Sequence, residues 1–301
     1  TEEEPPPRKP DVSDGRITHA VESELWIDEA VDANNIDVRT VEGIVTLTGT
    51  AENLLARERA ARIAAGTAGV RGVLNRVRVR PVPSRSDTAL REAVKNALFA
   101  DPVTERYEIR IGVEEGTVVL AGTVDSWQEK QLCATVAKGV RGVREVRNRI
   151  DVEYESGRPA REMEREVEAR LKNDVLVDDQ LIQVEVEDGK AVLSGTAGSL
   201  AEKNRAVHDA WVGGVRAVNA EDLRIEGWAR DRMRRKSLYA SRSDEEIEEA
   251  VRDAFLYDPR VSSLHPEVHV ENGTVTLTGV VDNLKARRAA ERDARNVIGV
   301  W

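Results

Sequence analysis

A repeated spacing of glycines divides this chain into four similar units. Gly43, Gly116 and Gly189 lie 73 residues apart, and the equivalent Gly273 follows after a step of 84. Three further sets of residues keep these steps: Gly49, Gly122, Gly195 and Gly279; Val21, Val94, Val167 and Val251; Asp28, Asp101, Asp174 and Asp258. Because independent positions obey one spacing, the chain is one small fold repeated in tandem.

Each unit contains the same succession of patterns. It opens with apolar residues four apart, such as Ile17, Val21 and Leu25, which predict one face of a helix. Two alternating segments follow, separated by an acidic residue or Asn and then Gly, a pair typical of a tight hairpin turn. A second helix and a short third strand, for example residues 77–79 or 150–152, complete the unit. The order α-β-β-α-β predicts an α+β fold with two helices packed on a small three-stranded mixed sheet.

These patterns also predict where the units begin and end. The expected parts are an extended tether over 1–13, modules over 14–80, 86–153 and 157–226, a basic linker over 227–242, and a fourth module over 243–301. The fourth module stops before its third strand, so we expect a truncated copy with an exposed sheet edge, and a sequence that is a fragment. Whether a signal peptide preceded Thr1 or the sequence was trimmed is left open.

Composition restricts the classes of function. No apolar run reaches the roughly 18 residues that a membrane-spanning helix needs. The formal net charge of −10 does not suit a nucleic-acid-binding protein, which normally carries a basic surface. The single cysteine excludes an intrachain disulfide. Cys133 takes a position held by Ala60, Ala206 and Ala290 in the other units, so we predict a buried structural thiol.

No arrangement of residues predicts catalysis. His265 and His269 are separated by Pro266 at the start of a strand, which favours surface histidines over a metal pair. Asp28 and its equivalents recur in every unit, where an aspartate that closes a helix has an ordinary structural role. Phosphate-binding loops and nucleophile elbows are missing from the sequence. We therefore expect no catalytic, cofactor-binding or metal-binding residues, and no enzymatic activity.

The combined pattern resembles the BON domain, a family named for bacterial osmotically inducible and nodulation proteins. The resemblance rests on Gly-Thr-Val-x-Leu-x-Gly-x-Val, clearest at 116–124 and 273–281, and on Gly-Val-x-x-Val-x-Asn-x-Ile-x-Val at 142–152. It covers nearly all of the chain outside the tether and the linker. It implies a bacterial protein of the periplasm or outer membrane, phospholipid binding as proposed for the module, and no enzymatic activity. The third unit departs from the pattern after Asn219, where its last strand is lengthened.

The linker over 227–242 is the one segment that interrupts the repeats. It holds six basic residues and one acidic residue, a charge of +5 within an acidic chain. Basic side chains mixed with aromatic ones suit an anionic lipid surface. The candidate lipid-binding residues are Trp228, Arg230, Arg232, Arg234, Arg235, Lys236 and Tyr239. The alternative is a solvated spacer whose aromatic residues pack against the neighbouring modules.

The sequence thus predicts a non-enzymatic binding protein of the bacterial envelope. The preferred partner is anionic phospholipid at a membrane surface, with no role for nucleic acid. The alternative is a periplasmic scaffold or chaperone-like array of modules that binds envelope proteins.

Overall fold

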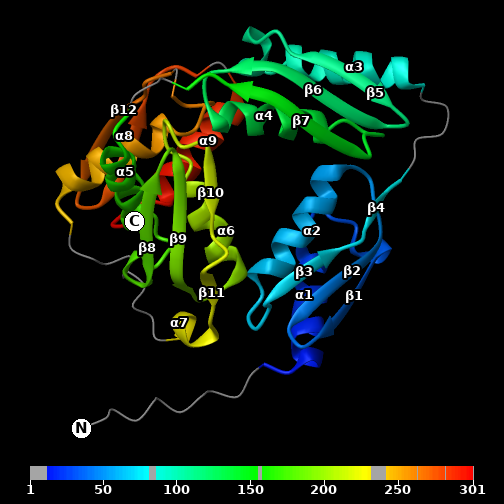
Figure 1. The fold of residues 1–301 in the computed structure, drawn as a ribbon, viewed down its shortest axis with the longest axis horizontal. Coiled ribbons are helices and arrows are strands. Elements are labelled where there is room, and N and C mark those ends of the chain that lie inside the picture. The colour runs from blue at the N-terminus through cyan, green and yellow to red at the C-terminus, as the bar shows by residue number, and fades with distance from the viewer. Residues whose placement is uncertain are drawn as a thin grey trace.

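The computed structural model describes residues 12–80, 86–154, 158–231, 242–262, 264–281 and 283–300. Four α+β repeats follow one another along the chain (Figure 1). Repeat 1 consists of α1 (Asp14–Ile27), β1 (Ile36–Val41), β2 (Ile44–Ala51), α2 (Leu54–Gly66), β3 (Gly72–Asn75) and β4 (Arg78–Val79). Repeat 2 consists of α3 (Asp87–Phe99), β5 (Arg110–Glu114), β6 (Thr117–Val124), α4 (Trp127–Lys138) and β7 (Glu145–Val152).

Repeats 3 and 4 keep this order of elements. Repeat 3 consists of α5 (Ala160–Asn173), β8 (Ile182–Glu187), β9 (Lys190–Ala197), α6 (Leu200–Asp209), β10 (Ala217–Asn219) and β11 (Leu223–Ile225), and the short α7 (Gly227–Asp231) follows it. Repeat 4 consists of α8 (Asp244–Leu256), β12 (Glu267–Glu271), β13 (Thr274–Thr278) and α9 (Leu284–Arg295). The predicted α+β fold is confirmed, and repeat 4 is the shorter copy.

The sheets share one topology. The first two strands of each repeat form an antiparallel hairpin, and in repeats 1 to 3 the last strand pairs in parallel with the second. Among the described residues of repeat 4, the sheet contains β12 and β13. The four predicted hairpin turns are confirmed. At the first of them Glu42 and Gly43 both have positive φ, 50° and 73°, which matches the turn type expected from the sequence.

An aspartate in the first turn of the first helix fixes this hairpin turn. The Asp14 carboxylate accepts hydrogen bonds from the backbone N–H groups of Glu42 and Gly43, at 2.8 and 2.9 Å. Asp87 and Asp244 do the same in repeats 2 and 4, and Ala160 takes the position in repeat 3. The interaction joins the start of the helix to the tip of the hairpin about 28 residues later. Sequence reasoning did not identify it.

The third strand differs from the prediction in repeats 1, 2 and 3, and in repeat 2 it begins at Glu145 although the prediction was 150–152. In repeat 1 it begins at Gly72, earlier than expected, and is interrupted after Asn75. The Asn75 side chain donates to the carbonyl of Arg57 in α2, at 2.8 Å, and accepts from the N–H of Val77. Asn148 makes the same two contacts in repeat 2, where β7 is continuous, so these contacts alone do not explain the break. In repeat 3 the lengthened spacing after Asn219 produces a turn, so β10 and β11 pair with β9 as separate short strands.

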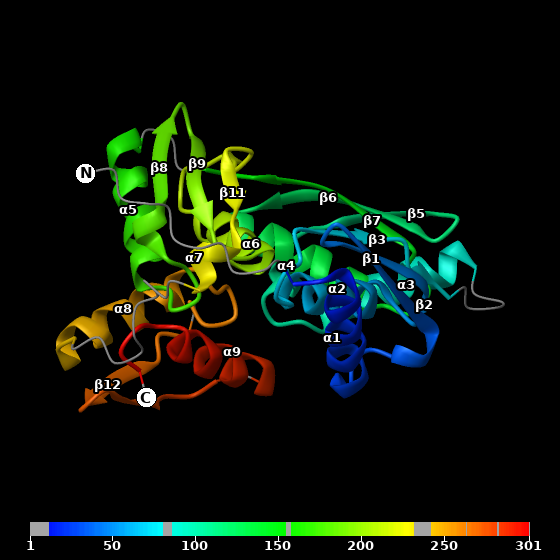
Figure 2. The same ribbon diagram turned by 90° about the horizontal axis from the view of Figure 1, so that it is seen from below.

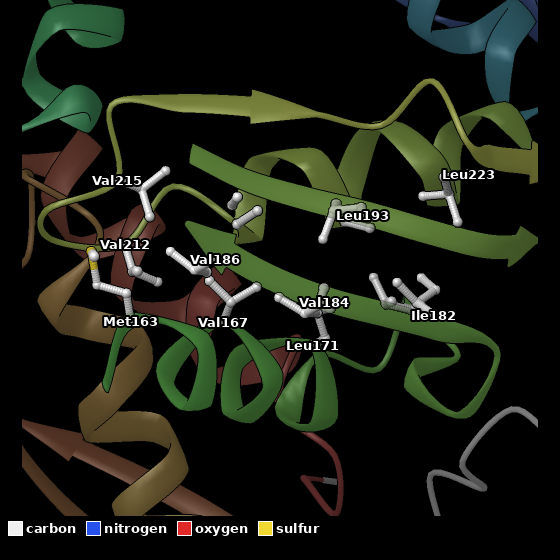
Figure 3. Close-up of a cluster of buried hydrophobic side chains, with 14 of the residues drawn as sticks. Met163, Val167, Leu171, Ile182, Val184, Val186, Leu193, Val212, Val215 and Leu223 are labelled. Carbon is white, nitrogen blue, oxygen red and sulfur yellow. The ribbon is translucent and has the colours of Figure 1, made fainter. Parts of the chain in front are cut away.

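Both helices and the inward strand residues of a repeat form one core. Figure 3 shows this in repeat 3, where Met163, Val167 and Leu171 of α5 face Val184 and Leu193 of the sheet. The apolar positions predicted for the first helix are buried in all four repeats: Ile17, Val21 and Leu25; Leu90, Val94 and Leu98; Met163, Val167 and Leu171; Ile247, Val251 and Phe255. Alanines on the second helix, such as Ala60 and Ala64, let that helix lie close to the sheet.

The repeats pack against one another through their second helices. Figures 1 and 2 show α2, α4 and α6 around the middle of the molecule, and α2 contacts both of the others. Leu54, the first residue of α2, is buried with the core of repeat 2. Trp127, the first residue of α4, stacks on Trp211 of repeat 3 with ring centroids 4.7 Å apart and an angle of 6° between the rings. The same helix position therefore makes the contact to the next repeat in both cases.

Candidate functional site

The segment that follows repeat 3 begins as the short helix α7. This helix lies against β9, and Ala229 is buried there. Trp228, the residue before it, remains 45% exposed. The helix thus fixes the start of the predicted lipid-binding segment to repeat 3 while leaving part of its tryptophan accessible.

The other candidate lipid-binding residues lie largely beyond the described part of the chain. The backbone of Arg230 belongs to α7, but its side chain is outside the description. The remaining five, Arg232, Arg234, Arg235, Lys236 and Tyr239, fall outside the described residues. Of the seven side chains, only that of Trp228 lies in the described part of the chain, so their role stays a prediction.

Arg242, the last basic residue of the linker, has a structural role. Its guanidinium donates to the side-chain oxygen of Asn173 at 3.0 Å, at the end of α5 in repeat 3. This contact holds the start of repeat 4 to repeat 3. Asn173 is neutral, so Arg242 keeps its positive charge and still counts toward the charge of +5 of the segment.

Repeats 3 and 4 also meet through their backbones. Val175 donates its N–H to the carbonyl of Asn296 at 2.9 Å, and Ile298 donates to the carbonyl of Asn173 at 3.1 Å. The guanidinium of Arg170 in α5 lies over the ring of Tyr257, 4.0 Å from its centroid, a favourable cation–π arrangement. We call this region the 3–4 junction.

Four aspartates and three arginines form a charged cluster at the 3–4 junction. Each of repeats 3 and 4 places two aspartates close together, at equivalent positions: Asp174 with Asp209, and Asp258 with Asp293. Arg170 lies 3.4 Å from Asp209, Arg205 pairs with Asp174, and Arg292 lies 2.5 Å from Asp258. Repeats 1 and 2 carry Ile63 and Val136 where Asp209 and Asp293 stand, so this pairing belongs to the 3–4 junction.

The two added aspartates hold protons more tightly than ordinary carboxyl groups. Burial raises the pKa of Asp209 to about 7, and the nearby Asp174 acts in the same direction. Burial and the neighbouring Asp258 raise the pKa of Asp293 to about 7. One oxygen of each carboxylate, Oδ2, lacks a hydrogen-bond donor among the described residues. The junction therefore contains two groups that titrate near neutral pH.

A large apolar side chain is exposed at the same position of the first helix in three repeats. Trp26, Phe99 and Leu256 are 69, 71 and 63% exposed, and repeat 3 has Lys172 there. We call these three residues the helix-1 apolar positions. They fall off the buried i, i+4 stripe, so the helical pattern alone marks them as solvent-facing. The signal in the sequence that marks them is the recurrence of a large apolar residue at the repeat spacing.

Cys133 behaves as predicted. Its side chain is fully buried, with 0% exposed, and desolvation raises the pKa of the thiol to about 12. The thiolate, which is the reactive form, is therefore scarce at neutral pH.

The possible metal ligands of the described residues lie apart: among those residues, no group of three or more His, Cys, Asp or Glu side chains is placed to hold a metal ion. His269 lies in β12 and His265 precedes Pro266 with φ of 43°. Of the helices described, none combines the length and apolar character that crossing a bilayer requires.

Two curated proteins are similar to half of this chain. Osmotically-inducible protein Y of Escherichia coli (strain K12) is 32% identical over 143 residues, which cover 46% of this chain and 71% of that protein. The 21 kDa hemolysin of Actinobacillus pleuropneumoniae is 29% identical over 140 residues, covering 45% of this chain and 70% of that protein. The match in each case has about the length of two repeats.

Comparison with solved structures found the type III secretion protein CdsD of Chlamydia trachomatis. It is 16% identical and covers 72% of this chain and 97% of its own, but the TM-score is 0.19, too low to support any argument about arrangement. The family model of the BON domain matches residues 13–81, 86–154, 160–227 and 243–301. Those ranges take in almost every described element, including all four hairpins with their positive-φ turns. The chain belongs to the BON domain family.

Proposed function

We propose that this protein is a non-enzymatic binding protein of the bacterial envelope that contacts anionic phospholipid at a membrane surface. The observation that carries the proposal is the charge of the segment over 227–242, which is +5 in a chain of net charge −10. The half-exposed Trp228 stands at the start of that segment. Each Lys or Arg near an anionic bilayer contributes about 1 kcal/mol of attraction, and tryptophan favours the headgroup region.

The proposed location is the periplasm or the periplasmic face of the outer membrane. Support comes from membership of the BON family and from the similarity to osmotically-inducible protein Y. In this role the basic segment between repeats 3 and 4 makes the contact with the bilayer.

Vesicle co-sedimentation tests the lipid contact. The intact chain should bind vesicles of phosphatidylglycerol and phosphatidylethanolamine, release them as salt rises, and ignore neutral vesicles. The variant Arg232→Glu, Arg234→Glu, Arg235→Glu should lose this binding while keeping its circular dichroism spectrum.

A control with the same change in charge is available on α9. Arg287→Glu, Arg288→Glu, Arg295→Glu alters three exposed arginines of repeat 4. We expect it to bind anionic vesicles nearly as well as the parent. If the α9 variant loses binding and the linker variant keeps it, the lipid contact lies on α9. If the parent ignores anionic vesicles at low salt, the lipid proposal fails.

A second candidate function is protein binding by a periplasmic scaffold or chaperone-like array. It is favoured by the helix-1 apolar positions, because Trp26, Phe99 and Leu256 are exposed although they are large and apolar. Acidic residues lie one helical turn before two of them: Glu22 is four positions before Trp26, and Asp253 is three positions before Leu256. Such surroundings suit an unfolded cationic polypeptide better than an anionic lipid.

Suppression of aggregation tests this second function. The intact chain should reduce light scattering by reduced lysozyme, a basic unfolded client, and the variant Trp26→Ser, Phe99→Ser, Leu256→Ser should lose that effect. The control Val280→Ser, Leu284→Ser removes exposed apolar residues elsewhere in repeat 4 and should retain it. Equal suppression by both variants would reject a role for the helix-1 apolar positions.

A further inference from the structure

The third residue of the second helix separates the repeats into two kinds. Repeats 2 and 3 have Glu129 and Glu202 there, and both side chains are buried. The Glu202 carboxylate accepts the backbone N–H groups of Asp178 and Gly198, each at 2.9 Å. Glu129 likewise accepts the N–H of Asp125 at 3.0 Å and pairs with Arg106. In these repeats, a carboxylate thus fills the space between the second helix and the neighbouring loops.

Repeat 1 has Ala56 at this position and a cavity where the carboxylate would lie. The cavity has a volume of about 180 Å³. Its lining includes Ala56, Asp32 and Glu52, and the last two are the equivalents of Asp178 and Gly198. The residues whose N–H groups hold a carboxylate in repeat 3 therefore surround an open space in repeat 1.

The backbone of this cradle has the same shape in both repeats. Asp32 has φ −80° and ψ 89°, against −91° and 87° for Asp178. Asn53, which begins the second helix, has φ −151° and ψ 172°, against −156° and 162° for Ser199. Within the described chain, the N–H groups of Asp32 and Glu52 meet no acceptor. Repeat 1 thus keeps a pair of donors arranged for a carboxylate that its own sequence does not supply.

The charges around the cavity restrict what can occupy it. Glu29, Asp32 and Glu52 are among the lining residues, so a simple anion in the cavity has three acidic residues around it. The Asp32 carboxylate also accepts hydrogen bonds from the side-chain amides of Asn34 and Asn35. Arg80 is the nearby cation, 3.9 Å from Asp32, and it donates to Thr50 Oγ1 at 3.2 Å. A ligand that carries a positive nitrogen close to its carboxylate satisfies both the donors and the acidic lining.

Repeat 4 also has an alanine at this position, Ala286, but its cavity is occupied by another repeat. Pro102, Val103 and Arg106 of repeat 2 line the space beside Ala286, and about 40 Å³ remains. The ion pair between Asp101 and Arg260, at 2.9 Å, holds the two repeats together there. The cavity of repeat 1 is over four times larger in volume and is lined by repeat 1 alone.

We propose that the cavity of repeat 1 binds a small zwitterion, with its carboxylate on the N–H groups of Asp32 and Glu52 and its ammonium facing Glu29, Asp32 and Glu52. A molecule of the size of glycine or β-alanine fits the volume. This site is separate from the linker and from the helix-1 apolar positions, so it stands or falls independently of the proposed function.

Amide NMR titration of the intact chain tests the site. Glycine and β-alanine should shift the amide resonances of Asp32 and Glu52, whereas propionate and ethylammonium should bind more than about tenfold more weakly. The variant Glu29→Gln, Glu52→Gln should reverse this preference in favour of propionate. Equal binding of propionate and β-alanine by the parent, or shifts that leave Asp32 and Glu52 unmoved, would overturn the proposal.

Substitution at Ala56 provides the second test, because repeats 2 and 3 show what a glutamate does at this position. Ala56→Glu should place a carboxylate on the same donors, raise the melting temperature and abolish the response to β-alanine. The converse variant Glu202→Ala should open a similar cavity in repeat 3, and propionate or β-alanine should restore part of its lost melting temperature. A folded Ala56→Glu variant that still binds β-alanine at Asp32 and Glu52 would contradict the assignment.

Discussion

At the scale of single residues, the aspartate that joins the first helix to the hairpin makes the clearest prediction. Replacing Asp87 with Ala removes two hydrogen bonds to the N–H groups of Glu115 and Gly116, at 2.9 and 3.2 Å. Since hydrogen bonds to a charged group contribute about 1.5–3 kcal/mol when well formed, and this site is partly exposed, we expect a loss of about 1–2 kcal/mol. Urea unfolding measures it.

The matched control is Glu92→Ala, which removes an exposed carboxylate from the same helix. It should leave the free energy of unfolding almost unchanged. A loss equal to that of Asp87→Ala would mean that helix charge, and not the hairpin contact, is responsible.

Cys133 gives a second prediction at this scale. Cys133→Ala should change the free energy of unfolding by less than about 1 kcal/mol, because alanine is the residue that the sister repeats accommodate at the same buried position. A thiol reagent should label the native parent slowly at pH 7, since the pKa of the thiol is raised to about 12. Labelling at the rate of a free thiol would contradict burial.

At the scale of elements, the junction between α5, α6 and α9 predicts a dependence on pH. Asp209 and Asp293 have pKa values of about 7 in the folded state, against about 3.8 when exposed. Folding therefore takes up protons, and this contribution to stability is full below pH 3.8 and is lost as pH rises through 7. The titration of one neighbouring group, His208, must be separated from it. His208, although exposed in part, has a pKa lowered to about 4 by desolvation and by Arg205 and Arg170, and acts in the opposite direction between pH 4 and 6.5.

The variant Asp209→Asn, Asp293→Asn isolates the aspartate contribution, because His208 is common to both proteins. Between pH 5.5 and pH 8, the melting temperature of the parent should decrease by more than that of the variant. Asp151→Asn, Asp222→Asn, at exposed positions, should follow the parent. If the double junction variant keeps the full pH dependence of the parent, these carboxyl groups are not its source.

The element scale also shows what sequence periodicity could and could not predict. The buried faces of the helices and the four turn glycines could be predicted, because each depends on a short segment alone. Apolar residues four apart define a helix face, and a positive φ defines the turn. The break after Asn75 and the start of β7 at Glu145 depend on how the third strand pairs with the second, which spacing does not encode. For the same reason, the Asp14 contact to the hairpin tip was not foreseen.

At the scale of the whole molecule, the arrangement of repeats was the part that the sequence left open. Repetition predicts that the units are alike, but the contacts between them use residues at which they differ. One such contact is the stacking of Trp127 on Trp211. Another is the ion pair between Asp101 of repeat 2 and Arg260 of repeat 4. The equivalent residues Asp28 and Asp174 instead pair with an arginine of their own repeat. The prediction of the lipid-binding site rested on the composition of the linker alone, and only the side chain of Trp228 lies among the described residues.

The pairing of Asp101 with Arg260 also bears on how such a protein can evolve. In arrays where each unit contacts only its neighbours, a duplication or deletion merely lengthens or shortens the stack. Here repeat 2 is joined to repeat 4 and α2 of repeat 1 contacts α6 of repeat 3, so the units close on one another. Inserting a fifth unit between repeats 2 and 4 would separate surfaces that have become specific to each other. Once such contacts had formed, each unit had its own place in the molecule and could no longer be exchanged for its sisters.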